Sequence, residues 1–176
     1  NNTHRGRIQR RKARLKPADA ATVRGSIAVG IPRIIDAAKQ NGIVRPLPDV
    51  PSLAIGSAEV TPIELVTAYA PFANGGYRVK PRLVRSIETA DGTQLWAQEQ
   101  SPLTPVMDPR DAYQVTSMLQ SVVDYGTGKA IRDYGVRGLV AGKTGTTNSG
   151  TDVWFVGYTP TVVAGFWFGL DTPGPI

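Results

Sequence analysis

The fold is decided by the stretch Ala141-Gly142-Lys143-Thr144-Gly145-Thr146-Thr147, which stands between two predicted turns. Its residues 141–146 end the first of three predicted strands, residues 139–146, 152–158 and 161–170, the last two of which are rich in β-branched and aromatic side chains. Only short turns separate them, so consecutive strands must run in opposite directions. The sequence therefore predicts an antiparallel three-stranded meander with Lys-Thr-Gly on its first strand.

The residue types of this strand are typical of an acyl-transfer site. Alternation places Lys143 and Gly145 on one face of the strand and Thr144 and Thr146 on the other. An ammonium group attracts a carboxylate-terminated substrate, and threonine hydroxyls can hydrogen-bond to it. Glycine allows a substrate backbone to pair with the strand, so that the N–H of Thr146 can donate to a developing oxyanion. Taken alone, the tripeptide favours an ordinary exposed strand, since three such residues occur by chance in many chains.

Capping signals upstream predict helices over residues 61–74 and 108–125. Thr61 is an N-cap candidate with Pro62 at the first helical position and Glu64 where a capping box needs it. Asp108 and Pro109 open the second helix in the same way, and its buried face is expected to hold Ala112, Val115, Met118, Leu119 and Val122. Thr127, in the glycine-flanked loop that follows, is interpreted as a turn residue.

Shorter elements complete the prediction. Residues 31–41 form a short helix that ends at Gly42, and the three prolines of residues 45–52 favour an extended loop. Residues 82–88 and 93–97 flank Asp91-Gly92, which predicts a β-hairpin. Helices and antiparallel strands together indicate an α+β fold.

The positive charge lies outside this patterned region. Residues 1–16 hold seven basic and no acidic residues, whereas the remainder of the 176-residue chain holds 13 basic and 14 acidic residues. The basic segment has no aromatic residue for nucleic acid to stack on, so no nucleic-acid partner is expected. Residues 1–21 are interpreted as a basic, unpatterned segment that looks foreign to the fold of residues 22–176. Residues 1–16 are expected to make few contacts with the rest of the chain.

Residues 22–176 resemble the transpeptidase domain of class A penicillin-binding proteins, the bifunctional peptidoglycan synthases. The resemblance rests on five stretches in the family's order: Pro51-Ser-Leu-Ala-Ile-Gly-Ser-Ala-Glu-Val-Thr-Pro62, Ala68-Tyr-Ala-Pro-Phe-Ala-Asn-Gly-Gly-Tyr77, Thr116-Ser-Met-Leu-Gln-Ser-Val-Val123 with Gly126-Thr-Gly128, Gly142-Lys-Thr-Gly-Thr-Thr147, and Asp152-Val-Trp-Phe-Val-Gly-Tyr158. It implies the C-terminal part of a penicillin-binding transpeptidase or serine β-lactamase-like fold, with helices on an antiparallel sheet that is incomplete in this fragment.

The resemblance also implies the chemistry. The parent protein is expected to cross-link stem peptides through a serine acyl-enzyme, with β-lactams as mimics of the donor. Lys143 and Thr146 match catalytic positions, and Thr144, Gly145 and Thr146 match substrate-binding positions. No cofactor or metal is expected. The protein is expected at the extracytoplasmic face of the bacterial membrane, anchored only by a segment outside this sequence, because no apolar run here approaches the roughly 18 residues that a span needs.

Two family motifs are missing. No serine in the sequence is followed three residues later by lysine, so the nucleophile is absent and the fragment alone is expected to be inactive. Pro17-Ala18-Asp19 stands where the family has Ser-x-Asn. Either the site is lost or residues 1–21 come from a frame error or a fused end. A non-catalytic module with the same fold and a serine β-lactamase relative remain as alternatives.

Overall fold

A computed structural model describes residues 19–99, 101–147, 150–172 and 174. The predicted lack of contacts for residues 1–16 falls outside this part of the chain. The predicted boundary after Ala21 lies inside a continuous helix, α2 (Asp19–Val29), which the sequence pattern did not predict. The division of the chain at this point remains a prediction.

The predicted meander is present as one antiparallel sheet. Strands β5 (Ala141–Thr146), β6 (Asp152–Tyr158) and β7 (Val163–Gly169) lie in the order β5-β6-β7, so β5 forms one edge. Lys143 pairs with Val156, which pairs in turn with Gly165 on β7. Cross-strand partners share a face, so this row points toward the helices.

Two helices pack on that face because their apolar stripes turn toward it. Helices α4 (Pro62–Ala73) and α5 (Pro109–Tyr125) begin at the predicted caps, with the capping box between Thr61 and Glu64 formed and Asp108 accepting from the Arg110 N–H. Leu119 of α5 joins Ala141 and Tyr158 of the sheet in a buried cluster. The Tyr158 hydroxyl lies 2.9 Å from that of Thr116, which satisfies both groups inside the core.

The contact between α4 and the sheet is close enough to require glycine. A Cβ atom at Gly165 would lie 2.5 Å from Cγ2 of Val66. Burial on α5 also extends beyond the predicted face, because Val123 is as fully enclosed as Val122. The helix end is therefore covered on two sides.

The remaining helical elements lead from α2 toward α4. Helix α3 (Ile31–Asn41) is present as predicted and ends at Gly42, whose φ of 123° favours glycine. The loop predicted over residues 45–52 is extended only as far as Val50, because Pro51 opens the 3-10 helix η1 (Pro51–Ile55). A short helix, α6 (Ala130–Asp133), follows α5 and was not predicted.

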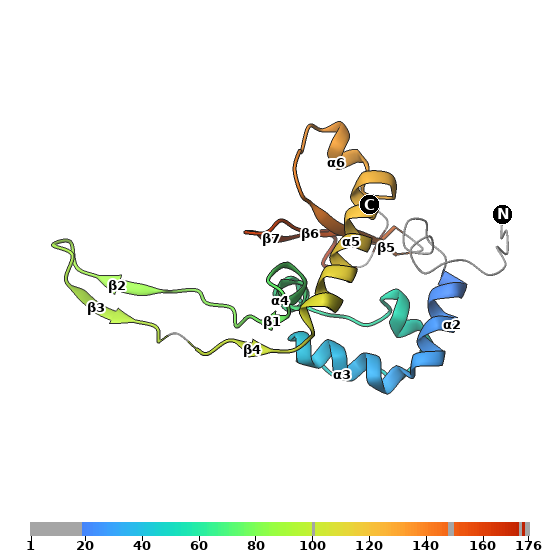
Figure 1. Cartoon of the computed structure of the whole chain (residues 1–176), viewed down its shortest axis with the longest axis horizontal. Helices are drawn as coiled ribbons and strands as arrows, with labels where there is room; N and C mark the ends of the chain where they lie inside the picture. Colours follow the sequence, from blue (N-terminus) through green and yellow to red (C-terminus); the bar gives the residue numbers. More distant parts are fainter. Residues whose placement is uncertain (1–18, 100, 148–149, 173, 175–176) are drawn as a thin grey trace.

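The predicted hairpin projects far from the body of the molecule (Figure 1). Strands β2 (Ser86–Glu88) and β3 (Gln94–Ala97) pair around Gly92, whose φ of 86° suits the turn. All residues of both strands are exposed. At the base of the projection, β1 (Tyr77–Arg78) pairs with β4 (Thr104–Pro105). Strands of two residues are too short to show a pattern in the sequence, so this pairing was not predicted.

Candidate active site

A cavity of about 820 Å³ lies beside the edge of β5 that pairs with no other strand of the described residues. Lys143, Thr144, Gly145 and Thr146 all line it, so the strand that was expected to pair with a substrate backbone lies at a sheet edge and faces a groove. The other described lining residues are Asp19, Ile55, Gly56, Ser57, Ala58, Glu59, Val60, Pro62, Leu65, Tyr69, Thr147, Asp152, Trp154, Val156 and Trp167. The cavity therefore lies between β5, the segment from Ile55 to Val60 and the first turns of α4.

The side chain of Lys143 is hydrogen-bonded to the backbone of the next residue on the edge strand. Nζ of Lys143 donates to the carbonyl oxygen of Thr144 over 2.6 Å. The carbonyl and N–H of one strand residue point to the same side, and alternate residues repeat that direction. Thr144 and Thr146 therefore direct their backbone polar groups toward the same side of β5, where the ammonium lies.

Gly145 is constrained by the sheet as well as by the cavity. A Cβ atom at this position would lie 3.3 Å from Cβ of Trp154 on the neighbouring strand. Such a contact is tighter than most real ones, so packing inside the sheet gives a second reason for glycine here.

Thr127 reaches the edge strand, which the interpretation as a turn residue did not include. Its Oγ1 lies 2.6 Å from Oγ1 of Thr144, although 17 positions separate the two in sequence. The turn after α5 is therefore both a helix end and a neighbour of the Lys-Thr-Gly strand. The glycines that flank Thr127 predicted the turn, but no local pattern predicts its distant partner.

The cavity is also lined by Thr147, Asp152, Trp154 and Trp167, for which the sequence analysis did not single out a role. Oγ1 of Thr147 accepts from the N–H groups of Thr151 and Asp152, over 3.0 and 3.1 Å. Nε1 of Trp167 donates to Oδ1 of Asp152 over 2.9 Å, and the rings of Trp154 and Trp167 lie 6.2 Å apart. The signal for this group was available, because alternation along β6 puts Asp152 and Trp154 on the same face as Val156.

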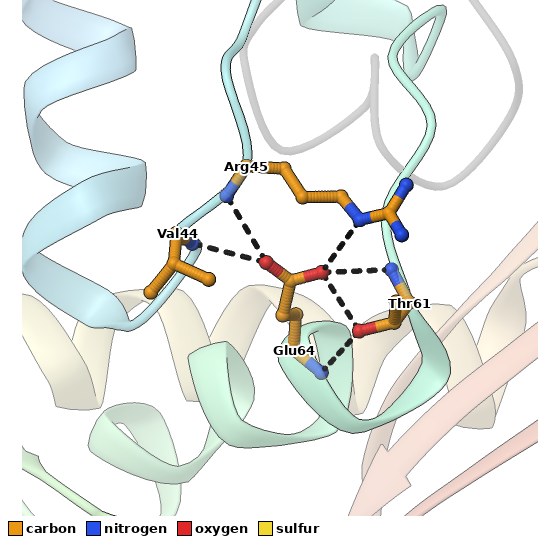
Figure 2. A network of polar contacts seen from close by, with 4 residues as sticks. All are labelled: Val44, Arg45, Thr61 and Glu64. Carbon is orange, nitrogen blue, oxygen red and sulfur yellow. Dashed lines mark hydrogen bonds and ion pairs between the residues drawn. The ribbon is translucent and has the colours of Figure 1, made fainter.

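Residues 55–60 line the cavity within a segment whose two ends bind one carboxylate, that of Glu64 (Figure 2). Glu64 Oε1 accepts from the N–H groups of Val44 and Arg45, both at 3.1 Å. Its Oε2 accepts from the hydroxyl and the N–H of Thr61, at 2.7 and 3.0 Å. Both ends of the segment 44–61, which carries the cavity wall, therefore meet on Glu64.

Hydrogen bonding also fixes the charge of this carboxylate. The pKa of Glu64 is lowered to about 2, first by the hydroxyl of Thr61 and then by its N–H, with smaller contributions from Val44 and Arg45. The guanidinium Nε of Arg45 lies 3.5 Å from Oε2, but this side chain is half exposed and adds little. Glu64 is thus ionised whenever the protein is folded near neutral pH.

The charges around the cavity are uneven. Three acids, Asp19, Glu59 and Asp152, line it, and Lys143 is the one cation among its described lining residues. Asp19 occupies the last position of the Pro17-Ala18-Asp19 stretch, so the structure brings this position to the cavity that also holds Lys143. Within the described part of the chain, no cluster of acids and histidines is suited to hold a metal ion, and no helix is long and apolar enough to cross a membrane.

Comparisons with known proteins agree with this architecture. The sequence model of the penicillin-binding protein transpeptidase domain family matches residues 12–173 of this chain. The match begins before the predicted boundary at residue 22. Penicillin-binding protein 1A of Rickettsia prowazekii is 35% identical over 180 residues, which cover 90% of this chain and 23% of that protein. The protein of the same name from Neisseria gonorrhoeae is 44% identical over 133 residues, 72% of this chain and 16% of that protein.

Solved structures share the fold. Penicillin-binding protein 1A from Haemophilus influenzae superposes with a TM-score of 0.87 at 22% identity, over 94% of this chain and 30% of that one. PonA1 from Mycobacterium tuberculosis, in complex with penicillin V, gives a TM-score of 0.78 at 23% identity, over 99% of this chain and 51% of that one. The chain spans at most about a quarter of the length of these curated relatives.

Proposed function

The chain belongs to the transpeptidase-domain family of class A penicillin-binding proteins, and from that premise we propose that it supplies the substrate-binding edge of a D,D-transpeptidase. The observation that carries the proposal is the position of Lys143 to Thr146 on a free sheet edge beside a cavity. A donor peptide can add to such an edge as an extra strand. The complete protein would then act as a peptidoglycan synthase that cross-links stem peptides.

The proposed reaction is an acyl transfer in two steps. A serine oxygen attacks the carbonyl between the two terminal D-alanines of a donor stem peptide, and the last D-alanine leaves with the proton that serine lost. An amine of a second stem peptide then attacks the ester, forms the cross-link and regenerates the serine. β-Lactams are proposed to acylate the same serine because their strained amide imitates the donor.

Each residue of the edge strand has a part in that reaction. Lys143 brings positive charge to a cavity that must accept the donor's terminal carboxylate, and the hydroxyls of Thr144 and Thr146 donate hydrogen bonds to it. Gly145 leaves room for the peptide backbone. The N–H of Thr146, which shares its direction with the Thr144 carbonyl, is proposed as one half of the oxyanion hole.

The nucleophile is not proposed to come from this chain. Among the described residues that line the cavity, the one serine is Ser57. Its hydroxyl donates to the hydroxyl of Ser52 over 3.0 Å and not to a base. A serine without a base in hydrogen-bond reach is a poor nucleophile. The chain alone is therefore expected to form no covalent adduct with a β-lactam.

The complete protein is proposed to act outside the cytoplasmic membrane, because its stem-peptide substrates are located there.

Asp19 favours a second candidate, a non-catalytic module that keeps the fold. The family's Ser-x-Asn motif offers a hydroxyl and an amide, whereas Pro17-Ala18-Asp19 offers a carboxylate that faces the same cavity as Lys143. A carboxylate repels the anionic end of a donor peptide and cannot donate a hydrogen bond when ionised.

One set of acylation measurements tests the proposal and separates the two candidates. The chain is joined behind the N-terminal part of a class A transpeptidase domain that carries Ser-x-x-Lys, and its reaction with a fluorescent penicillin is followed by denaturing electrophoresis and mass spectrometry. Lys143→Ala should slow acylation by about 10²–10³, the usual cost of losing one preorganised electrostatic group. Lys39→Ala is the control, because Lys39 is exposed on α3 outside the cavity lining.

The outcomes are distinct. Acylation that depends on Lys143 supports the transpeptidase. Acylation that appears only after Pro17→Ser and Asp19→Asn supports the non-catalytic module. An unchanged rate in a well-folded Lys143→Ala variant contradicts the role given to this lysine, and an adduct on the unjoined chain contradicts the missing nucleophile.

A further inference from the structure

The contact between Thr127 and Thr144 joins two hydroxyl groups and involves a residue with no part in the function proposed above. Their Oγ1 atoms lie 2.6 Å apart, a short hydrogen bond in which either group can be the donor. Thr144 lines the cavity, whereas Thr127 is not among its described lining residues. Thr127 therefore lies behind a residue that is proposed to touch the ligand.

The turn that carries Thr127 is fixed to the core. The N–H groups of Gly126 and Gly128 both donate to the carbonyl oxygen of Val122, over 3.0 and 3.1 Å. Val122 is fully buried on α5, and Gly128 is buried as well. The next residues continue the anchoring, since the N–H of Lys129 donates to the Gly126 carbonyl. The hydroxyl of Thr127 is thus presented by a braced turn and not by a free loop.

A pair of hydroxyls has two arrangements, and they present different groups to a ligand. When Thr127 donates to Thr144, the proton of Thr144 is free to point into the cavity and can donate to a ligand oxygen. When Thr144 donates to Thr127, only lone pairs of Thr144 face the cavity, and these repel a carboxylate. A carboxylate ligand therefore selects the first arrangement.

We propose that Thr127 is a positioning residue that donates its hydroxyl proton to Thr144, so that Thr144 donates to the terminal carboxylate of the donor peptide. The inference rests on the proposed function, because it assumes that a carboxylate binds at this edge. Thr127 does not touch the ligand. It acts by setting the direction of one hydrogen bond, and so contributes to the choice of a carboxylate over a neutral end group.

The test compares two ligands that differ only at that end. Binding of N-acetyl-D-Ala-D-Ala and of its C-terminal carboxamide to the 176-residue chain is followed by NMR titration. Thr127→Val, which keeps the branched shape without the hydroxyl, should weaken carboxylate binding about three- to tenfold, the usual range for one lost hydrogen bond. Carboxamide binding should be weakened less, because the amide N–H can donate to Thr144 and does not require Thr144 as a donor.

Three further variants make the result specific. Thr127→Ser retains the hydroxyl and should bind like the wild type. Thr144→Val should lose the same discrimination, and adding Thr127→Val to it should cost nothing more, because the second residue acts only through the first. Thr104→Val, on β4 outside the described lining of the cavity, controls for the loss of a threonine hydroxyl as such.

The contrary results are separable. Equal carboxylate binding by wild type and Thr127→Val shows that Thr127 is only a turn residue, and an equal loss for both ligands shows a distorted loop; either result overturns the inference and leaves the proposed function standing. A wild-type chain that binds the carboxylate no better than the carboxamide contradicts the proposed function, and the inference falls with it.

Discussion

The β2–β3 hairpin and strand β5 both lie at the edge of a sheet, yet they are held in place by different forces. The hairpin projects from the body and exposes every residue of its strands (Figure 1). Strand β5 begins with two buried residues under α5 and becomes exposed only at Thr146. Turn chemistry is enough to shape the first, whereas packing against a helix gives the second a fixed position.

The largest expected effect comes from replacing a leucine by alanine in each of the two regions, in separate variants. Leu119 is 3% exposed on α5 beneath β5, and Leu95 is 64% exposed on β3. Leu119→Ala should lower the free energy of unfolding by about 2–5 kcal/mol, because it leaves a cavity in the core. Leu95→Ala should change it by less than about 0.5 kcal/mol, as at other surface sites. Urea unfolding followed by circular dichroism gives both values, and similar losses would show that the hairpin belongs to the core.

A smaller effect is expected from adding one methyl group to the sheet. Gly165→Ala places a Cβ atom 2.5 Å from Cγ2 of Val66, and overpacking of this kind costs about 1–3 kcal/mol. The double variant with Val66→Ala should recover part of the loss, because it removes the atom that is struck. Additive losses in urea unfolding would mean that β7 does not press on α4 as described.

The Glu64 network should make the body, but not the hairpin, sensitive to acid. The pKa of Glu64 is lowered from 4.5 to about 2, mainly by the Thr61 hydroxyl. Its stabilising contribution is therefore complete above pH 4.5 and is lost as pH falls from 4.5 toward 2. Glu64→Gln should destabilise the protein at pH 7, and its difference from the wild type should shrink as pH falls through that window.

The matched control for this titration is Glu88→Gln on β2. Glu88 is exposed on the hairpin, so the substitution should change the free energy of unfolding by less than about 0.5 kcal/mol at pH 7. Urea midpoints at pH 7, 5 and 3 check both variants. A constant gap between wild type and Glu64→Gln across these values would contradict the lowered pKa.

The smallest effect on overall stability is expected at the hairpin tip. Gly92 has a φ of 86° with open space around it, so Gly92→Ala strains the backbone without any collision. The strain of about 1–2 kcal/mol should raise amide exchange in β2 and β3 roughly tenfold and leave global unfolding unchanged. A matching drop in the global unfolding free energy would join the two regions into one cooperative unit.

The sequence predicted the features that local chemistry determines. The caps at Thr61 and Asp108, the turn at Gly92 and the meander of β5 to β7 all follow from residues close together in the chain. The position of Lys143 beside a groove was expected because a substrate backbone must pair with its strand, and the family resemblance implied what that strand does. The roles of Lys143 and Thr146 remain predictions.

What the sequence missed depends on partners far away in the chain. The capping box identified Glu64, but not that Val44 and Arg45 bind its other oxygen. Thr127 looked like a turn residue because its partner is 17 positions away. Helix α2 has only one buried residue, Ser26, whose hydroxyl bonds to the Val23 carbonyl, so it lacks the apolar stripe by which helices are recognised.

Glu64 binds both ends of the segment 44–61, and this affects how the cavity can change during evolution. Because both ends of this segment bind Glu64 on α4, the residues between them form a loop that is closed at its base. The length of this loop can change without moving the helices on either side. Doubling the length of such a loop costs only about 0.6 kcal/mol in closure entropy. Insertions between η1 and Thr61 can thus change one wall of the cavity while the Lys-Thr-Gly strand is left as it is, so this segment is where the shape of the cavity can diverge most easily.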